Sequence, residues 1–263
     1  MSVRTYTGPG PTRRPGGLAT GLVWLLAGAT IVLQIAYPLA ADTARGTLAA
    51  WTVVVFCAAS LTHAWVYRGI TWAAAYFVIA AGGGLLAEVV GTRTGWPFGE
   101  YDYGSVLGVT VLGVPAVVPL AWAMMLYPTY VVATTLAQRS WVAAVIAGFS
   151  MMAWDVFLDP MMVELGAWRW ITQATELPGV PGIPLVNFAG WFVVATVLSA
   201  LVLALPRRDV PIGQPATLYL WVYVSSTVGA AVFFDRAGVA LVGGVAMGLV
   251  ALPFAYDMWR DRA

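Results

Sequence analysis

The sequence predicts an all-α fold: a polytopic integral membrane bundle of about eight transmembrane helices. Of 263 residues, 60% are hydrophobic and only 10% are charged, with a mean hydropathy of +0.82. Soluble domains carry about 25% charged residues. Apolar segments also recur along the whole chain, each close in length to the roughly 20 residues that a helix needs to cross a bilayer core. They lie at 18–40, 47–67, 70–90, 112–136, 141–159, 186–205, 216–234 and 238–256.

The arginines divide unevenly between the two ends of these segments. Residues 1–17, rich in Arg, Pro and Gly, are predicted to be a disordered cytoplasmic tail, followed by a single transmembrane domain at 18–263. With eight spans, nine arginines fall on the side of the termini and four on the other. Positive charge favours the inside, so we expect a cell-membrane protein with both termini cytoplasmic. Seven spans is the alternative, if one segment lies in the interface. The four outer arginines are Arg45, Arg93, Arg169 and Arg236.

Composition excludes several classes of site. The net charge of +1 gives no field that would recruit nucleic acid. One cysteine, Cys57, and one histidine, His63, cannot form an intrachain disulfide, a cysteine metal cluster or a multi-histidine metal site. His63 lies near the inner end of its span, away from the acids, and is predicted to be structural. The chain has no lysine, which excludes a retinal Schiff base.

Three acidic residues lie at the ends of apolar segments. Asp155 and Asp159 are four residues apart and therefore share one face of a helix, which Pro160 is expected to end. Asp155 lies about 21 Å along its span, in the outer half, and Glu88 reaches the outer end of another span. A carboxylate at this depth costs about 2.5–3.5 kcal/mol on insertion scales. The three acids are candidates for proton transfer or for binding a metal-diphosphate.

Two long connections, 91–111 and 160–185, lie on the same outer side as the acids. Their aromatic, Gly and Pro content indicates a lid or the mouth of a cavity, although a membrane aromatic belt explains some of the rings. Gly82, Gly83 and Gly84 allow close approach of a helix or a ligand. Asn187 either caps its helix or orients a water molecule. The candidate substrate-contacting residues are Arg93, Trp96, Phe98, Tyr101, Tyr103, Trp122, Trp154, Trp168, Arg169, Trp170 and Asn187.

Several of these residues form an ordered set of motifs over residues 85–195. The motifs are Gly91-x3-Gly95-x-Pro97-Phe98-Gly99-x-Tyr101-x-Tyr103, Val114-Pro115, Pro119-Leu120-Ala121-Trp122, Asp155-x3-Asp159-Pro160-x5-Gly166-x-Trp168-x-Trp170 and Pro184-Leu185-x-Asn187-x2-Gly190-Trp191. This set resembles the CruF-type carotenoid biosynthesis family, which are integral membrane hydratases of carotenoid ends. The first two and last two spans match that family only in hydropathy.

The resemblance implies that water adds across the terminal C1–C2 double bond of an acyclic carotenoid end group and gives a tertiary alcohol. No cofactor and no metal is then required. The expected partners are the carotenoid, the lipid bilayer and other carotenoid biosynthesis enzymes. In this scheme Asp155 is the general acid, Asp159 the base that activates water, and Glu88 the reserve for either role.

Three other functions use some of the same features. A carotenoid end-group cyclase would form the same cation but quench it by ring closure. A membrane prenyltransferase would use an aspartate-rich motif, but it needs a second acidic motif and basic residues, and neither is evident. A lipid or isoprenoid transporter would show inverted repeats, which are also not evident. Which carotenoid is used, and whether one or both of its ends react, stays open.

Overall fold

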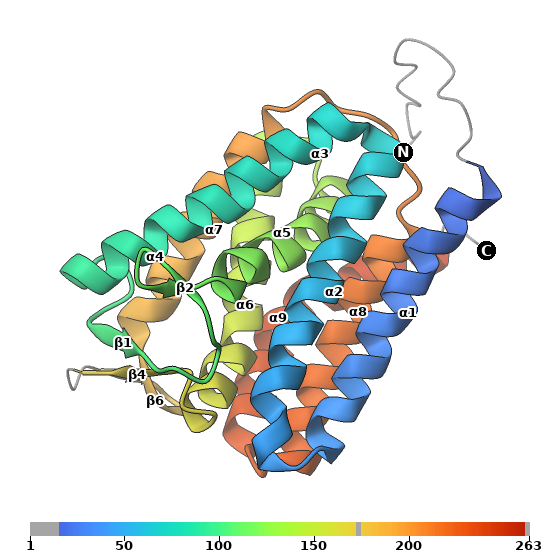
Figure 1. The fold of residues 1–263 in the computed structure, drawn as a ribbon. Helices are drawn as coiled ribbons and strands as arrows, with labels where there is room; N and C mark the ends of the chain where they lie inside the picture. The colour runs from blue at the N-terminus through green and yellow to red at the C-terminus, as the bar shows by residue number, and fades with distance from the viewer. Residues whose placement is uncertain (1–15, 172–174, 261–263) are drawn as a thin grey trace.

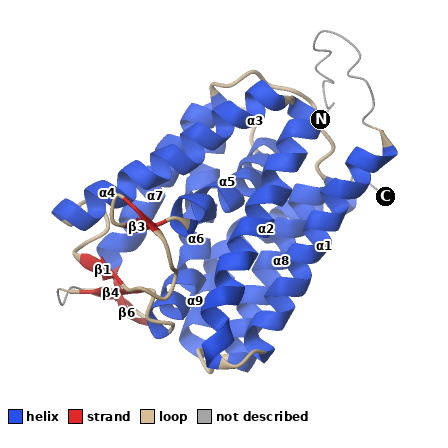
Figure 2. Cartoon of the chain, in the orientation of Figure 1, coloured by secondary structure: helices blue, strands red, loops and turns tan. Residues whose placement is uncertain are grey.

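The computed structural model of the chain describes residues 16–171 and 175–260, so the predicted N-terminal tail lies almost entirely outside the described residues. Within this part, eight helical segments are long and apolar enough to cross a membrane, which confirms the predicted helical bundle (Figures 1 and 2). They are α1 (Gly17–Leu39), α2 (Asp42–Arg68), α3 (Ile70–Phe77) joined by the π-helical turn η1 (Val78–Gly82) to α4 (Gly83–Thr94), α5 (Val117–Leu136), α6 (Ser140–Glu164), α7 (Leu185–Leu203), α8 (Gly213–Val228) extended by η2 (Gly229–Phe233), and α9 (Ala237–Arg260).

Tight glycine turns set the ends of two helices. Gly69 follows Arg68 and has a φ of 93°, a backbone conformation that glycine adopts easily because it has no Cβ. Helix α3 begins at the next residue. Gly95, with a φ of 73°, ends α4 in the left-handed conformation typical of helix termini.

Helices α5 and α6 form the interior of the bundle (Figure 1). Helix α6 packs against α5, α7 and α9, and α5 also packs against α2 and α8. Large side chains with no exposed surface, such as Trp122, Tyr76 and Phe254, fill the space between these helices. Because α6 is enclosed on several sides, its aspartates are held in the protein interior and not in lipid.

The outward faces of the bundle remain apolar. On α9, Leu241, Val245, Leu249 and Leu252 follow one another at helical spacing and are all more than half exposed. In water such a stripe would have to be covered, whereas hydrocarbon solvates it. The outer helices therefore present to lipid the surface that a soluble protein would bury.

The two long connections fold into short antiparallel ribbons. Strand β1 (Tyr101–Tyr103) from the first connection pairs with β4 (Trp168–Trp170) from the second, in the register Tyr101 to Trp170. The two connections are thus held together as one structure at one end of the bundle (Figure 2). The remaining pairs are β2 (Thr110–Val111) with β3 (Val114–Pro115), and β5 (Glu176–Leu177) with β6 (Val180–Pro184).

Two predicted helix boundaries are wrong. Helix α6 does not end at Pro160 but continues to Glu164. Proline removes only one backbone donor, and one further turn is tolerated here because Pro160 is buried against neighbouring elements. The segment expected to start at 112 begins as strand β3, and its helix starts only at Val117. Hydropathy does not distinguish an apolar strand from the first turn of a helix.

His63 is structural, as expected. Its Nδ1 lies 2.8 Å from the Tyr127 hydroxyl and its Nε2 lies 2.9 Å from the carbonyl oxygen of Pro211. A carbonyl can only accept, so Nε2 carries the hydrogen and Nδ1 accepts from Tyr127. The ring ties α2 and α5 to the connection that precedes α8.

We expect Gly148→Ala to loosen the packing of α6 on α7. A Cβ at Gly148 would lie 2.0 Å from Thr196 Oγ1 and 2.8 Å from the Thr196 backbone nitrogen, so the helices must separate. Overpacking of this kind costs about 1–3 kcal/mol. The control Gly28→Ala on α1 meets nothing within 4 Å. Thermal unfolding in detergent should show a lower midpoint for Gly148→Ala only; equal midpoints would contradict this packing.

Candidate active site

The two aspartates of α6 meet a single asparagine of α7. Asp155 is fully buried and Asp159 is 2% exposed. Asn187 Nδ2 donates to Asp155 Oδ2 at 2.9 Å and also to Asp159 Oδ2. Because one nitrogen reaches both acceptors, the two carboxyl groups must lie close together. The i, i+4 spacing brings them to one helix face, and the amide holds them there.

Asn187 does not cap its helix, which was one of the two roles that the sequence left open for it. It lies in the first turn of α7, which Pro184 precedes in an extended conformation without any side-chain cap. Its amide instead points across the helix interface to α6. A buried amide must use its donors inside the protein, and the two aspartates provide the acceptors.

The two carboxyl groups have different surroundings. Asp159 accepts a second hydrogen bond, from Trp168 Nε1 at 3.0 Å. Asp155 Oδ1 has no hydrogen-bond partner among the described residues. An oxygen of this kind, buried and without a donor, is suited to carrying or receiving a proton. Asp155 also lies behind Asp159, since only Asp159 lines the adjacent cavity.

Glu88 is the third acid of the site and reaches it from α4. Its Oε2 accepts from the hydroxyls of Tyr101 and Tyr103, the latter at 2.8 Å. Its Oε1 accepts from Trp122 Nε1 at 3.1 Å. Trp122 can come this close because Gly84 has no side chain: a Cβ there would lie 2.5 Å from the indole. The glycine run thus admits a ring of the protein itself.

Pairing of β1 with β4 positions four of the aromatic rings. Side chains alternate along a strand, so Tyr101, Tyr103, Trp168 and Trp170 all face the bundle and line the cavity. The intervening Asp102 and Arg169 face outward and form a largely exposed ion pair at 3.9 Å. Burial, reinforced by the charge of Glu88, raises the pKa of both tyrosines. Both hydroxyls therefore stay protonated and act as donors.

A cavity of about 60 Å³ lies between these groups. Asp159, Glu88 and Asn187 supply polar groups to its wall, and most of the remaining wall is aromatic or aliphatic. The rings of Trp122 and Trp191 stack in its wall with centroids 4.0 Å apart and planes 8° apart. The result is a small apolar space in which carboxyl groups from opposite sides face aromatic surfaces.

The family match fits this arrangement. Residues 46–253, which form most of the chain, match the family described as carotenoid biosynthesis protein. The chain belongs to the carotenoid biosynthesis protein family. With eight helices able to span a membrane among its described residues, this family member is a multi-pass membrane protein.

A curated relative has a more specific name. The chain is 29% identical over 188 residues to the bisanhydrobacterioruberin hydratase of Haloarcula japonica. The match covers 66% of this chain and 59% of that protein, so the chain spans less than two thirds of the relative's length. No solved structure matches the chain. The family and this relative support an enzyme with a carotenoid-modifying role.

The structure brings most of the predicted site residues of this carotenoid biosynthesis protein together. Around the cavity lie Glu88, Phe98, Tyr101, Tyr103, Trp122, Asp159, Trp168, Trp170 and Asn187. Asp155 lies behind Asp159 and does not line the cavity, and four other predicted residues lie elsewhere. Arg93, Trp96 and Arg169 are exposed, and Trp154 lines a second, neighbouring cavity. Loop residues alternate between inward and outward positions, which composition alone does not resolve.

Trp191 is a cavity residue that the site prediction omitted. It stacks on Trp122, makes an edge contact with Trp154, and approaches the first connection because Gly190 has no Cβ. A Cβ at Gly190 would lie 2.6 Å from the Pro97 carbonyl oxygen. The spacing of Trp191 from Asn187, one helical turn, is the signal that could have placed both on one face.

We expect Trp168→Phe to destabilise the protein more than Trp170→Phe. Both indoles lie on β4 and line the cavity, but only Trp168 donates to a carboxylate, whereas Trp170 Nε1 has no partner among the described residues. Loss of a hydrogen bond to a charged group costs about 1.5–3 kcal/mol beyond the shared loss of ring area. Thermal unfolding of the two variants side by side measures the difference. Equal destabilisation would mean that the Trp168–Asp159 bond contributes nothing.

Proposed function

We propose that this protein hydrates the terminal C1–C2 double bond of an acyclic carotenoid end group by acid catalysis. The observation that carries the proposal is the pair of buried carboxyl groups, Asp155 and Asp159, bridged by Asn187 beside a small aromatic cavity. Adding water to a hydrocarbon alkene needs a proton donor, a site that tolerates a cation, and a group that takes a proton back. The cavity offers all three.

The proton comes from the aspartate pair. Two carboxylates that share one donor away from water repel each other strongly, so a pair holding a single proton is the favoured arrangement. Asp159 lies in the cavity wall and delivers this proton to C2 of the alkene. The unpartnered Oδ1 of Asp155 holds or replaces the proton from behind. Asp159 is therefore proposed as the general acid in contact with substrate, and Asp155 as the group that supports it. This exchanges the roles expected from the sequence, because only Asp159 lines the cavity.

Protonation at C2 leaves a tertiary cation at C1, which the cavity stabilises. Faces of aromatic rings attract a cation by about 0.5–2 kcal/mol each. Phe98, Trp122 and Trp191 contribute such rings to the wall. Glu88 accepts hydrogen bonds from three donors, which stabilise its ionised form. Glu88 is therefore better suited to stabilise the cation as a carboxylate than to release a proton.

Water then completes the reaction. Its oxygen forms a bond to C1, and the extra proton on that oxygen passes to the carboxylate of Asp159. One water molecule is consumed, a tertiary alcohol forms, and the aspartate pair regains its single proton. Among the described residues, no three His, Cys, Asp or Glu side chains lie close enough together to hold a metal ion. The proposed sequence of steps uses none.

The aspartate variants test this mechanism. General acid–base groups typically contribute 10²–10⁴-fold. We expect Asp159→Asn to lower hydration by at least 100-fold, because the amide keeps the shape of the side chain and cannot deliver a proton. Asp155→Asn should be severe but weaker. The control Asp102→Asn changes an exposed aspartate on β1 and should leave the rate unaltered. The readout is the hydroxylated carotenoid formed in a lycopene-producing host.

Glu88→Gln separates the two sides of the cavity. If it abolishes hydration while Asp159→Asn retains most of it, α4 carries the acid. Hydration at near wild-type rates in all three variants would contradict the carboxyl mechanism. A product with the mass of lycopene but with a ring would instead indicate a cyclase.

The orientation in the membrane is part of the proposal. An even number of spans places both chain ends on one side, and nine of the thirteen arginines fall on that side. We expect both termini to be cytoplasmic and the β1–β4 ribbon to face outward. A reporter that is active only in the cytoplasm should be active when it is fused after Ala263. A periplasmic signal would contradict the orientation and move the site to the inner surface.

A further inference from the structure

A second cavity, of about 160 Å³, lies beside the first. It is enclosed by α1, α2, α6, α8 and α9, with residues of α5 and of the α8–α9 connection completing the wall. It is the larger of the two spaces, and the proposed reaction does not use it. Its apolar lining includes Phe56, Met124, Trp154, Phe157 and Met161.

The two cavities share part of their wall. Ala49 and Val53 on α2, and Leu158 and Met162 on α6, line both. Each pair has i, i+4 spacing and so lies on one face of its helix. These four residues, called the neck from here on, are the ones that line both cavities. Space on one side of the neck therefore adjoins space on the other.

Size requires a second space for the proposed substrate. A cavity of about 60 Å³ can receive an end group, but it is far too small for a whole carotenoid. The rest of the chain must extend away from Asp159. The second cavity offers an aromatic and methionine-rich lining that suits a conjugated hydrocarbon.

Two polar atoms in the second cavity indicate that it is not a dry packing defect. Gln34 Oε1 and Thr52 Oγ1 are buried and have no hydrogen-bond partner among the described residues. Empty cavities in proteins are apolar, whereas buried polar atoms normally face water or a ligand. These atoms are therefore expected to face water in the second cavity when no substrate is bound.

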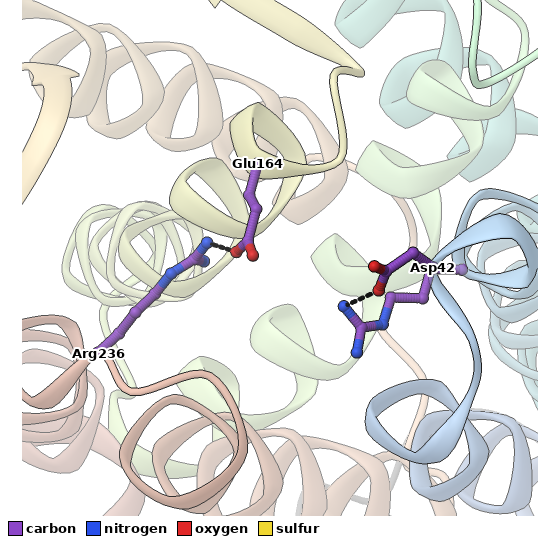
Figure 3. A network of polar contacts seen from close by, with 4 residues as sticks. Asp42, Glu164 and Arg236 are labelled. Carbon is purple, nitrogen blue, oxygen red and sulfur yellow. Dashed lines mark hydrogen bonds and ion pairs between the residues drawn. The ribbon is translucent and has the colours of Figure 1, made fainter.

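Charged residues mark the outer limit of this space. Arg236 lines the cavity and pairs with Glu164 at the end of α6, and Asp42 pairs with Arg45 at 2.8 Å at the start of α2 (Figure 3). A hydrocarbon chain gains nothing by crossing such ion pairs. The apolar route from Asp159 thus runs through the neck and into the second cavity.

We propose that the two cavities form one binding channel, in which the end group of an acyclic carotenoid lies against Asp159 and its polyene chain crosses the neck into the second cavity. This inference rests on the proposed hydration. The neck residues then act on substrate binding and not on the chemical step.

Val53→Phe and Met161→Trp test the channel. The first fills the neck, and the second fills the larger cavity without changing the wall of the smaller one. We expect both to raise KM for lycopene at least tenfold, with a much smaller change in kcat. Both should also weaken the visible circular dichroism of lycopene bound to the Asp159→Asn variant. The control Val54→Phe changes the next residue of α2, which is 38% exposed, and should behave as wild type.

The outcomes separate the two proposals. If the wild type forms no hydroxylated product from lycopene, the proposed function fails whatever the neck variants do. Suppose that the wild type hydrates lycopene and that the thermal midpoint of Met161→Trp shows this variant to be folded. If Met161→Trp then keeps the wild-type KM and the wild-type dichroism of bound lycopene, the proposed channel is wrong. Equal effects of Val53→Phe and Val54→Phe would also overturn it, because the neck would then have no special role.

Discussion

The site depends on one constraint: two carboxyl groups are buried side by side within the bundle and must be satisfied there. Asn187 meets this constraint by donating to both from a single nitrogen. Its position requires α7 to pack closely on α6, which Gly148 permits where it faces Thr196. The cost of burying the acids is thus offset by helix packing. A chain without this packing would leave charge or unpaired polar atoms at membrane depth.

The second requirement is that the two long connections cover the cavity. They do so because β1 and β4, from segments more than sixty residues apart, pair in one register. A slip of one residue would send Tyr101 and Tyr103 outward and bring Asp102 inward. The same pairing gives Glu88 its tyrosine donors and Asp159 its tryptophan donor. Fold, electrostatics and cavity shape are therefore linked by a few hydrogen bonds.

Much of this could be predicted from the sequence, because hydropathy reports span number directly and helical spacing places Asp155 and Asp159 on one face. The sequence only loosely indicated that Asn187 lies near the acids, and it did not indicate that Asn187 bridges them. Spacing within a helix says nothing of which neighbour a side chain meets. Arg169 was expected at the substrate but faces outward, since strand alternation depends on a register that composition does not contain. Arg93, expected there too, is exposed near the C-terminal end of α4. Trp191 was missed because its stacking partner, Trp122, lies on another helix.

The central claim is that a proton from the aspartate pair starts the reaction and that water supplies the hydroxyl. Membranes holding the wild-type protein and lycopene, incubated in water labelled with heavy oxygen under anaerobic conditions, test it most directly. The account predicts one labelled oxygen for each hydrated end, with no loss of activity in the absence of oxygen gas. A hydroxyl that carries no label from water, or a product that forms only when oxygen gas is supplied, would contradict the account and place the protein among the oxygenases.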